Sequence, residues 1–284
     1  MDRPYNFGPE GRLAGVWTPP DPSAARPDAP AIVLPNAYVT PHVGLFRLHV
    51  DLARRLAKLG FGSLRFDVSG IGDSVSHPET APYAERVPGD LATALDFAKQ
   101  ISGASDLLIL GHCDGANHAF RAALDDERVT GLVLIDAFMK DTWRYHLHRK
   151  VRHWRQRLDP RRVLVRKPAE DEAALGLNEV ADDAIVMYVA EDRAVLGPQC
   201  RTLRQRGTRL LWVFSGEFKR HCGLAELRRA VDLDSPQVHD DELRFFEAGH
   251  VYDQVAHREA LIDGIGHWLS EWPSEAPRSI STRS

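Results

Sequence analysis

The segment Gly111-His112-Cys113-Asp114-Gly115 places a thiol between two glycines, where an apolar run meets a helix-forming run. The apolar run, residues 107–110, has the length of a buried strand, and residues 116–124 are typical of a helix. A Cβ at either glycine would collide with neighbouring chain in the sharp turn between them. Cys113 is therefore predicted to stand at the carboxyl end of a strand and at a helix amino terminus, where unpaired N–H groups favour developing negative charge.

That position suits a nucleophile, and a cysteine nucleophile needs a base. The backbone N–H of Asp114 is expected to donate to the oxyanion that forms when a carbonyl group is attacked. Of the thirteen histidines, His250 is the candidate base because it follows closely on the last predicted core strand, residues 242–246. His112, beside the nucleophile, is a candidate substrate contact.

Strand-like and helix-like segments alternate along the chain, which predicts an α/β fold with a mostly parallel sheet flanked by helices on both faces. The expected strands are residues 31–34, 62–67, 107–110, 131–136, 208–214 and 242–246, with an edge strand at 12–17. The expected helices are residues 50–59, 89–101, 116–124 and 260–272. We expect the core to comprise residues 1–138 and 198–272, followed by a disordered tail at 273–284.

Residues 139–197 break this alternation and are predicted to form a helical cap over the carboxyl edge of the sheet. Apolar residues recur there every three or four positions from Trp143 to Leu158, which defines one face of a helix. Arginine and lysine residues cover its other side. Such a strip is typical of a solvated helix face, but it would also attract an anionic acyl donor bound to a carrier protein or to coenzyme A.

Residues 31–136 and 210–268 resemble the α/β-hydrolase superfamily, in which the turn around Cys113 is the nucleophile elbow. Within it, the chain is most similar to the exosortase-associated hydrolase group, which carries cysteine at that turn. The matching segments are Val43-Gly44-x-x-Arg47, Leu52-Ala53-Arg54-x-Leu56-Ala57-x-x-Gly60, Leu64-Arg65-Phe66-Asp67-x-x-Gly70-x-Gly72-Asp73-Ser74 and Gly111-x-Cys113-Asp114-Gly115-Ala116. The resemblance implies an α/β-hydrolase fold with Cys113 and His250 as catalytic residues, and structural hydrogen bonds from the aspartates of the loop that begins at Asp67.

The same resemblance directs attention to two further positions. The loop after the strand at residues 31–34 supplies the second oxyanion donor in this fold, and Ala37 or Tyr38 is the candidate. The acid that orients the base usually stands about four residues past the penultimate strand, where this chain has Lys219. Glu217 is then the favoured acid and Asp136 the alternative, and a Cys–His pair with no acid is a third possibility.

Composition excludes several other classes. The formal net charge is -4, and no apolar run approaches the length of a membrane span, so we expect no nucleic-acid partner and a cytoplasmic protein. Gly70-x-Gly72 is followed by Val75 where a dinucleotide-binding motif needs a third glycine. His146-x-His148 and His221-Cys222 lack the spacing of a four-ligand metal site, so we expect neither metal nor cofactor. The three cysteines indicate no disulfide framework.

These residues favour a Cys-dependent enzyme that cleaves an ester or thioester of a small-molecule acyl substrate through an acyl-enzyme on Cys113, with His250 as base. Two alternatives stay open. The acyl group could pass to an amine, alcohol or thiol instead of water, which would make the protein an acyltransferase. The protein could also be a non-catalytic, hydrolase-like binding protein with an inert Cys113. The sequence indicates no particular donor, acceptor or oligomeric state.

Overall fold

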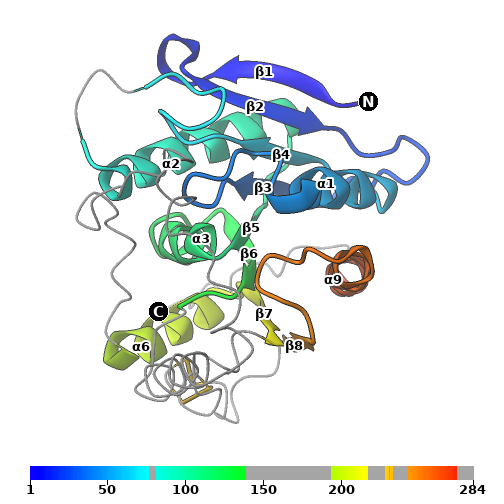
Figure 1. Ribbon diagram of the computed structural model, residues 1–284, viewed down its shortest axis with the longest axis vertical. Coiled ribbons are helices and arrows are strands. Elements are labelled where there is room, and N and C mark those ends of the chain that lie inside the picture. Colours follow the sequence, from blue (N-terminus) through cyan, green and yellow to red (C-terminus); the bar gives the residue numbers. More distant parts are fainter. Residues whose placement is uncertain (77–80, 139–192, 217–227, 230, 233–241, 274–284) are drawn as a thin grey trace, which may run out of the picture.

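The computed structural model describes residues 1–76, 81–138, 193–216, 228–229, 231–232 and 242–273, which form one twisted sheet with helices on both faces (Figure 1). Its strands are β1 (Arg3–Phe7), β2 (Leu13–Thr18), β3 (Ala31–Pro35), β4 (Ser63–Phe66), β5 (Leu107–His112), β6 (Val129–Ile135), β7 (Arg209–Ser215) and β8 (Glu242–Phe246). Its α-helices are α1 (Leu48–Lys58), α2 (Tyr83–Ser102), α3 (Asp114–Asp125), α6 (Arg193–Gln205) and α9 (Val255–Ser270). Two short 3-10 helices, η1 (Pro9–Gly11) and η2 (Leu45–Arg47), lie between them.

The strand order in the sheet is β1-β2-β4-β3-β5-β6-β7-β8. The strands from β4 to β8 in this order pair in parallel, as the alternation of segments predicts, while β1 and β2 run antiparallel to their neighbours. The expectation that residues 12–17 form an edge strand is wrong, because β1 pairs with β2 and occupies the edge. Of the β1 residues only Phe7 is buried, so β1 carries no apolar run that would mark it in the sequence.

Alternate residues of each core strand face opposite sides of the sheet and fill two separate cores. In β3, Val33 joins the core covered by α2, α3 and α6, whereas Leu34 joins the core covered by α1 and α9. The two groups of helices lie on opposite faces of the sheet in Figure 1. Because the central strands are buried on both faces, their sequences read as continuous apolar runs.

The helices differ from the expected ranges mainly at their ends. Helix α2 begins at Tyr83, before Pro88, and α9 begins at Val255. Helix α6 begins at Arg193, inside the range expected for the cap, and its Leu196 packs in the core beside β7. Residues 139–192 of the expected cap and 274–284 of the expected tail lie outside the described residues.

Within the described part of the chain, no helix combines the length and the apolar character that crossing a membrane requires.

Asp67, which follows β4, fastens the loops at the carboxyl edge of the sheet. Its fully buried carboxylate accepts hydrogen bonds from the backbone N–H of His42 and of Asp73 (3.1 Å), and His42 Nδ1 lies 2.7 Å from Asp67 Oδ2. A Cβ on Gly72 would lie 2.3 Å from the same carboxylate, so the loop can close on Asp67 only with glycine there. The structural role expected for Asp67 is consistent with these bonds.

We expect Asp67→Ala to lower the free energy of unfolding by about 2–4 kcal/mol, because buried donors then lose their acceptor. Asp73→Ala is the matched control, since that side chain is exposed and only its backbone N–H contacts Asp67. It should change stability by no more than about 0.5 kcal/mol. Urea unfolding of the two variants measures both values, and equal losses would contradict the role given to the Asp67 carboxylate.

Candidate active site

Cys113 occupies the sharp turn between β5 and α3. Its backbone angles are φ 55° and ψ -120°, a strained conformation for a residue with a side chain. The turn is held by the Cys113 N–H, which donates to the carbonyl of Ile135 at 2.8 Å. A Cβ on Gly111 would lie 2.5 Å from Ala116 Cα, and one on Gly115 would lie 3.1 Å from the carbonyl oxygen of Asn36. Gly111 is therefore needed for the close approach that the sequence predicts, and a Cβ at Gly115 would make a tight contact with the loop after β3.

His250 lies beside this turn although it is far from Cys113 in the chain. Its Nδ1 atom is 2.7 Å from Oδ2 of Asp136, which leaves Nε2 as the ring nitrogen for the hydrogen bond with the Cys113 side chain. Asp136 directly follows β6, the strand next to β5, and its carboxylate is fully buried. Its other oxygen, Oδ1, accepts the backbone N–H of Ser215 at 2.7 Å. The thiol, the imidazole and the carboxylate thus form one connected row at the carboxyl edge of the sheet.

The surroundings of His250 favour its positive charge. Burial lowers the pKa of His250, but the hydrogen bonds and negative charges of Asp136 and Cys113 outweigh that effect and raise the pKa to about 10 from an ordinary value of 6.5. A protonated imidazole between a carboxylate and a sulfur is the arrangement that favours a thiolate nucleophile.

The carboxylate that holds His250 is that of Asp136, which the sequence suggests only as the alternative. Glu217, the favoured candidate, lies outside the described residues. The sequence argument for Glu217 counts residues past β7, whereas the observed carboxylate comes from the end of β6. Because β6 pairs with β5, Asp136 after β6 and Cys113 after β5 come to the same edge of the sheet, where both bond to His250.

The candidate oxyanion donors lie on both sides of the turn. Asp114 is the first residue of α3, and the N–H groups of a helix's first turn have no partner within the helix. The loop with Ala37 and Tyr38 follows β3 and adjoins the turn at Gly115. Tyr38 has a positive φ of 48°, and its carbonyl accepts a hydrogen bond from the Asn36 side chain. Which of Ala37 and Tyr38 donates stays a prediction.

Two residues that sequence reasoning missed support this loop. Asn36 also accepts the backbone N–H of Val68 at 2.9 Å, so it ties the loop to the end of β4. Tyr83 of α2 packs its ring edge to face with Tyr38, with centroids 5.4 Å apart. Burial raises the pKa of Tyr83, and the Asp114 carboxylate raises it further, so its hydroxyl stays protonated. Neither residue belongs to a recognisable motif, and only the fold brings them together.

His112 does not take the position expected for a substrate contact. Its side chain is 3% exposed, and its Nε2 atom lies 3.0 Å from the carbonyl oxygen of His250. The buried ring packs against the rings of His250 and Tyr252, in the loop between β8 and α9.

Two groups of residues have ligand atoms close enough for a metal ion: His112 with Asp136 and His250, and His42 with Asp67 and Asp73. In the first group the His250 and Asp136 atoms bond to each other, and His112 bonds to a carbonyl oxygen. In the second group the Asp67 oxygens accept three hydrogen bonds from protein N–H groups. The ligand atoms of His112, Asp136 and His250, and those of His42 and Asp67, are thus engaged in hydrogen bonds within the protein.

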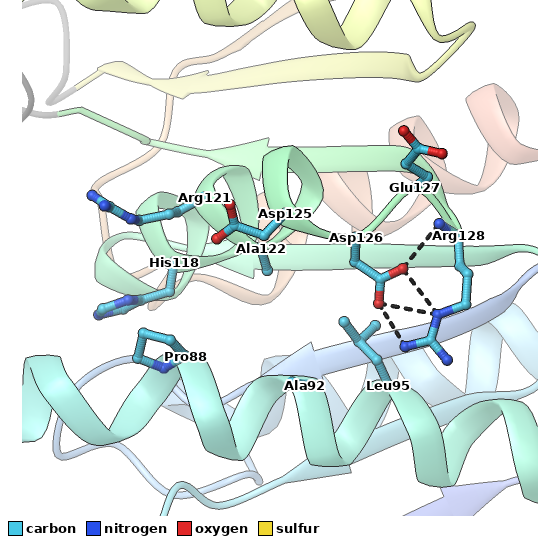
Figure 2. Close-up of a pocket in the computed structure, with 10 residues that line it drawn as sticks. All are labelled: Pro88, Ala92, Leu95, His118, Arg121, Ala122, Asp125, Asp126, Glu127 and Arg128. Carbon is cyan, nitrogen blue, oxygen red and sulfur yellow. Dashed lines mark hydrogen bonds and ion pairs between the residues drawn. The ribbon is translucent and has the colours of Figure 1, made fainter.

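A pocket of about 380 Å³ lies between α2 and α3 (Figure 2). It is lined by Pro88, Ala92, Leu95, His118, Arg121, Ala122, Asp125, Asp126, Glu127 and Arg128. The ion pair of Asp126 and Arg128 lies at one end, and His118 lies at the other. None of Cys113, Asp136 and His250 lines this pocket, so we do not assign it to the acyl substrate.

Solved structures with the same architecture place the chain in the α/β-hydrolase fold. An esterase of Pyrococcus furiosus superposes with a TM-score of 0.61 at 14% identity, over 96% of this chain and 90% of that one. A proline iminopeptidase-related protein from Thermus thermophilus gives a TM-score of 0.60 at 16% identity, over 97% and 100% of the two chains. A serine hydrolase without lid from Xanthomonas campestris gives 0.57 at 16% identity, over 98% and 96%.

A family model described as Serine aminopeptidase, S33, matches residues 42–194, more than half of the chain. The chain therefore belongs to this hydrolase family, and it has cysteine at position 113, in the turn between β5 and α3. A search of curated proteins found no match.

We expect Asp136→Asn to lower the pKa of His250, because asparagine has the shape of aspartate but lacks the negative charge that favours the imidazolium. NMR titration of the histidine rings measures the change. Asp125→Asn on the exposed end of α3 is the control and should leave the titration of His250 unaltered. An unchanged His250 titration in Asp136→Asn would show that Asp136 does not hold the imidazolium.

The raised pKa of His250 also sets the direction of a pH effect on stability. The folded protein binds this proton more tightly than the unfolded chain, so the stabilisation is complete below about pH 6.5 and is lost as the pH rises towards 10. Urea unfolding at pH 6.5 and pH 9.5 should show a larger loss of stability for the wild type than for Asp136→Asn. Equal losses would contradict this linkage.

Proposed function

We propose that this protein is a Cys-dependent acyl-transfer enzyme that cleaves an ester or thioester of a small-molecule acyl substrate. The observation that carries the proposal is the connected row of side chains in which Asp136 holds one nitrogen of His250 and Cys113 bonds to the ring. In this proposal Cys113 is the nucleophile, His250 the general base and acid, and Asp136 the residue that orients the imidazole. The backbone N–H groups of Asp114 and of Ala37 or Tyr38 stabilise the oxyanion.

The reaction proceeds in two balanced stages. In the free enzyme His250 already holds the proton of the Cys113 thiol, and the thiolate sulfur forms a bond to the substrate carbonyl carbon. Collapse of the tetrahedral oxyanion breaks the bond to the leaving alcohol or thiol, which takes the proton from His250. Water then gives a proton to His250 and attacks the acyl-thioester, and the carbon–sulfur bond breaks. The products are a carboxylic acid and the free enzyme, in which Cys113 is again a thiolate and His250 keeps the proton that water gave it.

Transfer to another acceptor is the second candidate function. The intermediate on Cys113 is a thioester, whose carbonyl is less stabilised by resonance than that of an oxygen ester, so attack by an amine is relatively favoured. An amine, alcohol or thiol that takes the place of water would make the protein an acyltransferase. Product analysis with and without hydroxylamine as acceptor separates the two outcomes.

The elbow cysteine also motivates the proposed placement in the exosortase-associated hydrolase group. The basic strip of residues 144–162 motivates a carrier-protein-bound or coenzyme A-bound donor, although these residues lie outside the described part of the chain. If an anionic carrier docks there, activity on a carrier-bound acyl group should fall with added salt more steeply than activity on a neutral ester. Equal salt dependence for the two substrates would contradict the docking of an anionic carrier at these basic residues.

We expect each wild-type molecule to gain one acyl group when the protein is mixed with a p-nitrophenyl ester. Intact-mass spectrometry detects the adduct, and peptide mapping should place it on Cys113. In Cys113→Ala the adduct should be absent, whereas Cys200→Ala should behave as the wild type, because Cys200 is fully buried in the core. An adduct of equal amount in Cys113→Ala would contradict the assigned nucleophile.

Alkylation separates the enzyme from a non-catalytic binding protein. A thiolate paired with an imidazolium should react with iodoacetamide at pH 6 at least about tenfold faster than the same thiol in His250→Asn. Equal rates in the two proteins would mean that Cys113 is inert, and the protein would then be a binding protein built on a hydrolase fold.

A further inference from the structure

His112 is a buried ionisable residue that the proposed reaction does not use. It is the last residue of β5 and directly precedes Cys113. Its ring lies against that of His250, with centroids 4.8 Å apart and planes tilted by 44°, and it meets Tyr252 edge to face at 6.0 Å. His112 therefore contacts the loop between β8 and α9, which carries His250, and it ends the strand that leads into Cys113.

The polar contact of His112 is with the main chain of His250. The carbonyl oxygen of His250 can only accept a hydrogen bond, so Nε2 of His112 carries the proton and donates it over 3.0 Å. The two catalytic side chains come from strands that are not neighbours, because β6 and β7 separate β5 from β8. The His112 hydrogen bond spans this separation and joins the nucleophile's strand to the base.

The groups around His112 keep it neutral. Burial lowers its pKa to about 4, and the positive charge on His250 lowers it too, while Asp136 and the His250 carbonyl act in the opposite direction. The pKa of His49, a fully buried residue of α1, is lowered to about 3, chiefly by burial and also by the neighbouring basic groups of His112, Arg65 and His42. Tyr252 completes the surroundings. Of His49, His112 and His250, only His250 is therefore an imidazolium at neutral pH.

We propose that His112 is a positioning residue, which fixes the main chain of His250 to the end of the nucleophile's strand and so sets the imidazole against both Cys113 and Asp136. The inference rests on the proposed function, since it concerns the alignment of the same three side chains. Removal of the His112 donor leaves the loop between β8 and α9 with other bonds, such as the one from Gly216 N–H to the Ala248 carbonyl at 3.0 Å. The fold should therefore survive while the alignment is lost.

The test compares His112→Phe, which keeps a ring of similar volume but no donor, with His112→Gln, whose amide nitrogen can replace Nε2. At pH 6 the rate of Cys113 alkylation by iodoacetamide should fall about tenfold or more in His112→Phe, because a misaligned base stabilises the thiolate less well. His112→Gln should recover most of the wild-type rate. Ester turnover should follow the same order through kcat, with KM little changed.

NMR titration of His250 in the same three proteins gives a readout that does not depend on turnover. We expect its pKa to fall by about one unit in His112→Phe and to return in His112→Gln, because the bond to Asp136 depends on the ring's position. Unchanged alkylation and an unchanged titration in His112→Phe would overturn the inference and leave the proposed function intact. Equal losses in both variants with a lower Tm would also overturn it, since the role would then be structural.

A wild type that alkylates no faster at Cys113 than His250→Asn does would instead overturn the proposed function. The NMR titration still decides the role of His112 in that case, because the hydrogen bond between His250 and Asp136 requires no reaction. A His250 pKa that does not respond to His112→Phe would then reject the positioning role as well.

Discussion

The hydrogen bond between His250 and Asp136 is the interaction on which the site depends. It joins a loop after the last strand to the end of a central strand, and it places a buried carboxylate beside an imidazole that also bonds to Cys113. A buried carboxylate is costly unless its oxygens are satisfied. Ser215 N–H satisfies the second oxygen of Asp136, so the charge that holds His250 is itself held by the backbone. The sheet thus supplies both the position and the electrostatic support of His250.

The order of strands explains why these residues meet. In a parallel sheet the carboxyl ends of the strands lie along one edge, where loops can bring distant residues together. Cys113 follows β5 and Asp136 follows β6, and the two strands are direct neighbours. His250 comes from the loop after β8 and crosses β7 to reach them. The strained turn at Cys113 is stabilised by the same neighbour, since its N–H bonds to the β6 residue Ile135.

Much of this arrangement could be predicted from the sequence because it rests on local patterns. Continuous apolar runs marked β3, β5, β6 and β7. The two glycines around Cys113 marked the turn, because other parts of the backbone approach closely at both positions. The edge strand β1 could not be found, because its residues are mostly exposed. Asp136 was only the alternative candidate for the acid, because counting residues past β7 takes no account of β6, the strand next to β5. The environment of His112 depends on several separate elements, so no local pattern contains it.

The position of Asp136, directly after β6, affects how such sites are recognised and how they can change. With Asp136 as the partner of His250, Ser215 at the end of β7 supports the site through its main-chain amide. A main-chain amide is supplied by every residue except proline. This hydrogen bond to Asp136 therefore does not depend on which residue other than proline stands at position 215. A search for the acid at the usual position past β7 would find Lys219 and score this chain as lacking an acid. Searches for divergent members of such families should examine both strand ends before they discard a sequence as inactive.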